Sequence, residues 1–284
     1  MTTTPFKFSL NIVLFGSITF NALAQKLPNV QRAGVYAPAN IKVDGRATEW
    51  SNKFQAYNHS TDIFYTLSND DSKLYLTVQA TSRAVINKIM NGGITFTVQP
   101  SGKKTDKGGA SITYPLFDRK DTPALPGAMS NIGGHGDEEI VLISPDGSGK
   151  PDQSKEPGNA NAMATYNKRL ENAKYIAVSG IKGLDSLLSA YNTDGVKVAQ
   201  LFDKNLVYTY EMAIDLKHLK LNVNAGANFA YHITLSGENK LALPTADESQ
   251  PVRGGGGGFM TMADPGPAPM AATDMWGDYT LVKK

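Results

Sequence analysis

Apolar and polar residues alternate with a period of two in several segments of this chain. The segment KLYLTVQA (73–80) is a clear case, because its apolar residues occupy the even positions while Tyr75, Thr77 and Gln79 occupy odd ones. The same alternation recurs at residues 93–99, 206–215 and 228–235. Successive side chains of a strand point to opposite faces, so the pattern predicts antiparallel strands with one face in a core and one toward solvent.

A turn sequence, SNDDSK (68–73), follows a further strand-like segment. Asn and Asp bond their own backbone and tolerate left-handed geometry, which predicts a β-hairpin from about residue 63 to 81. Helical spacing occurs only in RAVINKIM (83–90) and, more weakly, in NAMATYNKRLENAK (161–174). The chain is therefore expected to be all-β, an antiparallel sandwich of the immunoglobulin or jelly-roll kind with one or two short helices and long loop insertions.

The first 24 residues have the pattern of a secretory signal peptide. A lysine, Lys7, precedes a short apolar run, and small residues lead to an expected cleavage after Ala24. The run is shorter than the roughly 18 residues that span a bilayer, so no retained transmembrane segment is expected. The chain has no cysteine, which excludes a lipoprotein anchor and disulfides. We expect an exported protein, periplasmic or extracellular.

Residues 25–284 are expected to form a single domain. Glycine, proline, serine and asparagine are frequent at about 118–166, and glycine and proline at about 240–273, which predicts two surface insertions. The formal net charge is only +2, and the lysines are scattered rather than clustered. This distribution does not favour nucleic acid as a partner.

No catalytic motif is found in the sequence. A G-x-S-x-G elbow is missing, and SPDGSGKP (144–151) does not fit a phosphate-binding loop. The histidines, His59, His135, His218 and His232, lack the spacing of a zinc site and are expected to be ordinary surface or rim residues. These absences predict a protein that is not an enzyme.

One acidic loop is a candidate metal site. Asp137, Glu138 and Glu139 follow GGHG in a segment with few apolar residues. Calcium is bound by several oxygen atoms from flexible acidic loops, so these three residues are either Ca²⁺ ligands or part of a solvated loop.

Aromatic side chains are the other candidates for recognition, because sugar rings stack their C–H faces on Trp or Tyr. Tyr208 and Tyr210 alternate with core positions of their segment and are expected inside. Tyr75 lies on the polar face of its segment, and Trp276 belongs to the final strand-like run, MWGDYTLV (275–282). Tyr75 and Trp276 are therefore the predicted ligand-binding residues.

The order of four segments carries a family resemblance. IKVDGRATEW (41–50), SNDDSKLYLTVQAT (68–81), TYEMAIDLKHL (209–219) and DMWGDYTL (274–281) together resemble the family 9 carbohydrate-binding-module-like sandwich, a relative of the DOMON-like domains. The resemblance implies a β-sandwich, and members that bind sugar hold it between exposed aromatic side chains. Some DOMON-like relatives hold haem through a methionine and a histidine, for which Met212 and His232 are the nominees, but we do not expect haem here.

The first of these segments predicts a structural device. Asp44-Gly45 is expected to form a turn, after which Trp50 folds back to cover one edge of the core. The whole chain is thus expected to be an exported, non-catalytic binding protein that recognises a carbohydrate through a sheet face or loops. The alternative is a structural or protein-interaction component of the bacterial cell envelope, and the oligomeric state is left open.

Overall fold

The computed structural model describes residues 26–51, 53–117, 156–238 and 270–284. The predicted signal peptide (1–24), most of both predicted insertions, and the acidic loop with Asp137, Glu138 and Glu139 lie outside these ranges. Among the described residues, no helix combines the length and hydropathy needed to cross a membrane.

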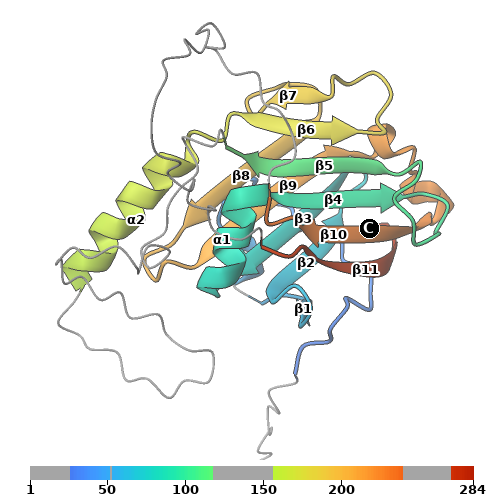
Figure 1. The fold of residues 1–284 in the computed structure, drawn as a ribbon. Coiled ribbons are helices and arrows are strands. Elements are labelled where there is room, and N and C mark those ends of the chain that lie inside the picture. The colour runs from blue at the N-terminus through green and yellow to red at the C-terminus, as the bar shows by residue number, and fades with distance from the viewer. Residues whose placement is uncertain (1–25, 52, 118–155, 239–269) are drawn as a thin grey trace, which may run out of the picture.

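Two antiparallel sheets pack face to face (Figure 1). One sheet has five strands in the order β1 (Ala56–Asn58), β2 (Ile63–Asn69), β3 (Lys73–Ala80), β9 (Tyr208–Asp215) and β8 (Val196–Phe202). The other has six, in the order β11 (Thr273–Thr280), β10 (Asn228–Leu235), β4 (Ile94–Gln99), β5 (Ala110–Leu116), β6 (Tyr175–Ser179) and β7 (Leu187–Ser189). The predicted all-β sandwich and the β2–β3 hairpin are confirmed.

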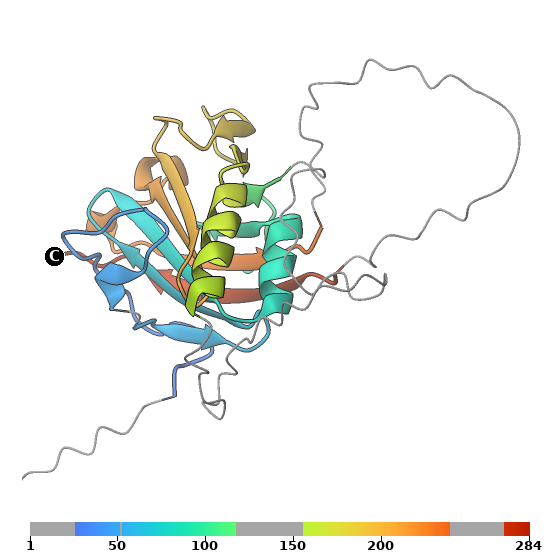
Figure 2. The ribbon, with the colours of Figure 1, turned by 90° about the vertical axis from the view of Figure 1, so that its left-hand side faces the viewer.

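Two helices lie at one end of the sandwich (Figure 2). The helix α1 (Arg83–Gly92) matches its prediction and buries Val85, Ile86, Ile89 and Met90. The helix α2 (Glu156–Leu170) begins earlier and ends earlier than the predicted 161–174, so residues 156–160, expected only within an insertion, are helical. The reason is local packing, because Tyr166 and Leu170 are buried in the main core. Three short 3₁₀ helices, η1 (Thr48–Trp50), η2 (Leu216–Leu219) and η3 (Val223–Ala225), complete the described elements.

The inner faces of both sheets form one core, in which tyrosine hydroxyls are paired. Tyr65 and Tyr231 come from opposite sheets, and their hydroxyl oxygens lie 2.9 Å apart. Tyr65 also accepts the backbone N–H of Gln31 at 2.9 Å. Gly277 lies opposite Tyr231 across the β10–β11 pair, and a Cβ atom there would come within 2.2 Å of the tyrosine ring. A glycine on β11 thus makes room for an inter-sheet hydrogen bond.

Asp70 fixes the turn of the β2–β3 hairpin. Its carboxylate accepts the backbone N–H groups of Ser72 and Lys73, each at 2.7 Å, and the hydroxyl of Tyr75 at 2.7 Å. Partial burial acts to raise the pKa of Asp70, but these hydrogen bonds outweigh it and lower the pKa. Asp70 is therefore used locally, as the turn prediction requires.

The chain before η1 lies on the outer side of the five-stranded sheet (Figure 2). Ala37, Ile41 and Val43 pack with Tyr75 and Ala213 in a second apolar cluster. As a result β3 and β9 are buried on both faces, and the prediction that their polar faces meet solvent is wrong. The covering segment is distant in sequence from the strands that it covers, so alternation alone could not show it.

The predicted turn at Asp44-Gly45 is confirmed by a φ of 81° at Gly45. The backbone N–H groups of Asp44 and Gly45 both donate to Oε2 of Glu211 at 2.9 Å. Glu211 is only 1% exposed. The turn therefore provides the hydrogen bonds that a buried carboxylate requires. Trp50 closes η1, and its indole nitrogen is buried without a hydrogen-bond partner in the described part of the chain.

Candidate functional site

The outer face of the six-stranded sheet carries polar and aromatic side chains near its β11 edge. On β10, Tyr231 and Ile233 belong to the core, so His232 between them points outward. On β11, Met275 and Tyr279 point inward, and Trp276 points outward. The register pairs His232 directly with Trp276, which places the two rings side by side on this face.

The rings of His232 and Trp276 are stacked. Their centroids lie 4.2 Å apart and their planes differ by 8°. One face of the indole is therefore covered by the imidazole. No described strand lies beyond β11, and Trp276 keeps partial exposure, so its second face is turned toward the open edge of the sheet.

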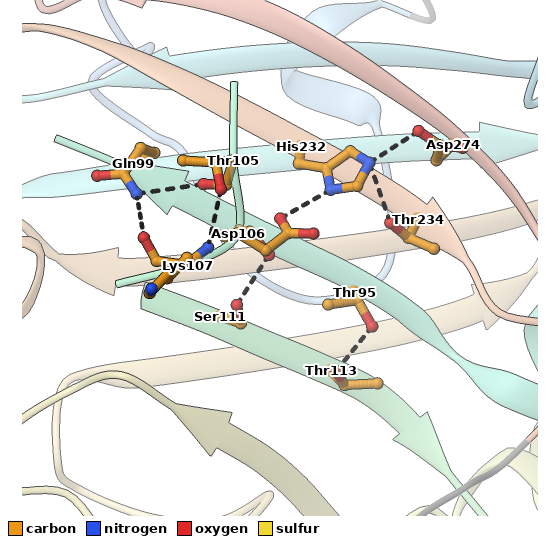
Figure 3. Close-up of polar contacts among 11 residues, drawn as sticks. Thr95, Gln99, Thr105, Asp106, Lys107, Ser111, Thr113, His232, Thr234 and Asp274 are labelled. Carbon is orange, nitrogen blue, oxygen red and sulfur yellow. Dashed lines mark hydrogen bonds and ion pairs between the residues drawn. The ribbon is translucent and has the colours of Figure 1, made fainter. Parts of the chain in front are cut away.

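Two carboxylates hold the imidazole in place (Figure 3). Nδ1 of His232 lies 2.9 Å from Oδ1 of Asp106, and Nε2 lies 2.9 Å from Oδ2 of Asp274. The histidine side chain is 11% exposed, whereas both aspartates are more than half exposed. His232 was expected to be an ordinary surface or rim residue, and this prediction is wrong because residues from two other elements enclose and bury its ring.

Asp106 belongs to the β4–β5 loop, residues 100–109, which folds back over the sheet. The side-chain amide of Gln99 donates to the carbonyl oxygens of Thr105 at 3.2 Å and Lys107 at 3.0 Å (Figure 3). Lys104 lies 3.3 Å from the carboxylate of Asp278 on β11. The loop is thus attached by polar contacts to three strands: to β4 through Gln99, to β10 through His232 and to β11 through Asp278.

Hydroxyl groups line the sheet beside this loop. Thr95 on β4 and Thr113 on β5 have hydroxyl oxygens 2.8 Å apart (Figure 3). Thr97 and Ser111 form an equivalent pair at 2.8 Å. Thr97 is buried, but Thr95 and Thr113 remain partly exposed. A hydroxyl has one donor and two acceptor positions, so each exposed pair retains capacity for a ligand.

The chemistry of this cluster fits binding better than nucleophilic attack. The hydroxyl of Thr234 is 3.4 Å from Nε2 of His232, which superficially resembles a nucleophile beside a base. Asp274 approaches the same nitrogen more closely, at 2.9 Å, and occupies the position that the hydroxyl would need. Asp106 and Asp274 lie beside different nitrogens of the His232 ring. Among the described residues, no group of three or more His, Asp and Glu side chains is arranged to hold a metal ion.

Tyr75 does not join this site. It is 8% exposed, its ring lies beneath the N-terminal segment, and its hydroxyl donates to Asp70. Burial and the neighbouring Asp70 carboxylate raise its pKa well above the ordinary value. Tyr75 and Trp276 point away from the core on different sheets, so the two predicted ligand-binding residues do not form one surface.

The other nominated residues are also separated. Met212 is fully buried on the inner face of β9, whereas His232 points outward from β10, so this pair does not share a pocket. The acidic residues Asp137, Glu138 and Glu139 lie outside the described part, and calcium binding there stays a prediction.

Sequence reasoning identified Trp276 but missed the residues around it. Alternation already placed His232 and Trp276 on the polar sides of their segments. The missing information was the strand register and the path of the β4–β5 loop, because Asp106 is 126 residues away from His232 and Asp274 is 42 residues away.

Comparison with known proteins gives little further information. No protein-family model and no curated protein matches the sequence. Among solved structures, the chain is similar to a carbohydrate binding module family 9 from Caldicellulosiruptor kristjanssonii in complex with glucose. The two chains are 8% identical, the match covers 89% of this chain and 96% of that chain, and the TM-score is 0.35. At this identity and TM-score the similarity does not bear on the ligand, and the function is judged from the residues of the chain itself.

Proposed function

We propose that this chain binds a carbohydrate on the outer face of the six-stranded sheet, centred on Trp276. The stacked pair of Trp276 and His232 is the observation that carries the proposal. It holds the indole ring in a fixed orientation while its second face remains at the sheet edge. Sugar rings present apolar C–H faces that pack on such a surface, and a fixed ring loses little conformational freedom on binding.

The polar groups around the indole suit a ligand rich in hydroxyls. Asp274 and Asp278 flank Trp276 on the same face of β11, and their side chains are 56% and 57% exposed. Carboxylates accept strong hydrogen bonds from hydroxyl groups. The partly exposed hydroxyls of Thr95 and Thr113 can both donate and accept. Together these groups supply the polar partners that stacking alone does not provide.

We also propose that the protein acts outside the cytoplasm and without catalysis. The leader pattern of residues 1–24 supports export to the periplasm or beyond the cell. The lack of a catalytic motif in the sequence, and the engagement of both His232 nitrogens by carboxylates, support a binding role.

A glycan array tests the proposal, with plant, host and bacterial polysaccharides as probes. The wild-type protein should bind at least one class, and Trp276→Ala should weaken that binding about tenfold, since a stacked aromatic contributes on the order of 1 kcal/mol beyond its buried area. Tyr191→Ala is the matched control. Tyr191 is 79% exposed and follows β7, at the opposite edge of the same sheet.

Two results would overturn the proposal. If no polysaccharide binds above background, the chain does not act on carbohydrate, and cross-linking in intact cells would test the envelope-interaction alternative. If Trp276→Ala and Tyr191→Ala weaken binding equally, or if only Tyr191→Ala weakens it, the sugar does not bind at Trp276.

A further inference from the structure

We propose that His232 is a proton-controlled clamp that closes the β4–β5 loop onto β11 and thereby tightens ligand binding at low pH. The effect on the ligand rests on the proposed carbohydrate function. The movement of the loop does not, because it follows from contacts within the protein.

The two nitrogens of the His232 ring face two different carboxylates. Nδ1 faces the carboxylate of Asp106 and Nε2 faces that of Asp274, each at 2.9 Å. A neutral imidazole carries one N–H, so it donates to one carboxylate and presents a lone pair to the other. Only the protonated ring donates to both. Protonation therefore adds a hydrogen bond across this arrangement.

The stacked indole of Trp276 also favours the protonated ring. A cation placed over the face of a tryptophan is attracted by the ring quadrupole. The imidazole of His232 lies parallel to Trp276 with ring centroids 4.2 Å apart. Protonation therefore strengthens the stack as well as the two hydrogen bonds, and it fixes the orientation of the proposed sugar platform.

Charged groups around the ring come from the β4–β5 loop and β11. The β4–β5 loop carries Asp106 and three lysines, Lys103, Lys104 and Lys107, and β11 carries Asp274 and Asp278. Lys104 is already paired with Asp278. On the neighbouring strands β4 and β5, the residues of the same face are threonine, serine and glutamine, which carry no charge. His232 is thus the cation that bridges Asp106 to Asp274.

Deprotonation of His232 should release the β4–β5 loop. Loss of the proton leaves two carboxylates on either side of a neutral ring. Asp274 is held in the β10–β11 ladder, whereas Asp106 is on a loop, so Asp106 is the partner that moves away. Because histidine changes charge between about pH 5 and 8, the loop is closed at the acidic end of this range and released at the alkaline end.

Nuclear magnetic resonance tests the clamp without any ligand. In the wild-type protein, the ring protons of His232 and the backbone amides of residues 101–109 should shift together as the pH changes, with one common midpoint. In Asp106→Asn the ring should still titrate while the loop amides no longer follow it. His59→Gln is the matched control, since His59 is exposed beside Tyr57 on the other sheet and should leave both titrations unchanged.

The affinity for the glycan identified by the array supplies the second readout. It should be about tenfold higher at pH 5.5 than at pH 8, a coupling in the range usual for linked sites. Asp106→Asn should remove most of this difference. A glycan bound with the same affinity at both values, or loop amides that do not follow His232, would overturn the clamp and leave the carbohydrate proposal standing. Failure to bind any glycan would overturn the carbohydrate proposal, while the loop titration would still decide the clamp.

Discussion

Replacing Glu211 with glutamine tests how the N-terminal segment is held on the five-stranded sheet. Glu211 accepts the N–H groups of Asp44 and Gly45 on one oxygen. Burial is the largest influence on this carboxyl group and raises its pKa from 4.5 to about 7, against the lowering effect of the two hydrogen bonds. The nearby charges of Glu49 and Asp44 act in the same direction as burial.

The size and sign of the effect follow from this pKa. The difference between 4.5 and about 7 corresponds to about 3 kcal/mol, at about 1.4 kcal/mol for each pH unit. A carboxyl group whose pKa is raised by folding contributes stability that is present below pH 4.5 and lost as the pH rises through 7. Glutamine stays neutral, and its amide oxygen can accept both N–H groups.

Urea unfolding at a series of pH values from about 4 to 8.5 measures the effect. The free energy of unfolding of Glu211→Gln, minus that of the wild type, should increase by about 3 kcal/mol across this range. Glu211→Ala is the contrasting variant. It leaves the N–H groups of Asp44 and Gly45 without their acceptor, so it should be less stable than Glu211→Gln by roughly 1–3 kcal/mol at every pH, since neither variant titrates at this position. A glutamine difference that is constant with pH would refute the reasoning, because Glu211 would then titrate alike in the folded and unfolded chains.

Two further substitutions test the core. Gly277→Ala should lower the free energy of unfolding by about 1–3 kcal/mol, because the added Cβ meets the ring of Tyr231. Thr280→Ala is the control, since Thr280 lies on the exposed side of β11 and its replacement should change this free energy little. Tyr65→Phe should cost about 1–3 kcal/mol, since the buried N–H of Gln31 loses its acceptor. Denaturant unfolding measures both, and unchanged stability in either variant would contradict the packing described for that residue.

The parts of the fold that depend on local sequence could be predicted. The SNDDSK turn and the alternation on either side of it specified the β2–β3 hairpin, and the spacing of Val85, Ile86, Ile89 and Met90 specified α1. Short strands such as β7, with three residues, are too brief to show a period. The helix α2 was placed imprecisely because its apolar stripe is weak and its burial depends on packing against β8.

The site could be predicted only in part, because its contacts are non-local. Trp276 was singled out as an aromatic residue outside the expected core. Tyr75 had the same sequence signal, and its face was covered by residues more than thirty positions earlier in the chain. The enclosure of His232 required a strand register and a loop path that alternation does not encode. Equal sequence signals thus led to one surface residue and one buried residue.

The central claim is that the outer face of the six-stranded sheet binds carbohydrate, and ¹⁵N-labelled protein tests it most directly. The chain has two tryptophans, Trp50 and Trp276, so two indole N–H resonances can be followed while the glycan from the array is added. The indole of Trp276 and the amides of β10, β11 and the β4–β5 loop should shift, while the indole of Trp50 stays unchanged. Shifts at Trp50 and the outer face of β2 and β3, with Trp276 unaffected, would contradict the claim.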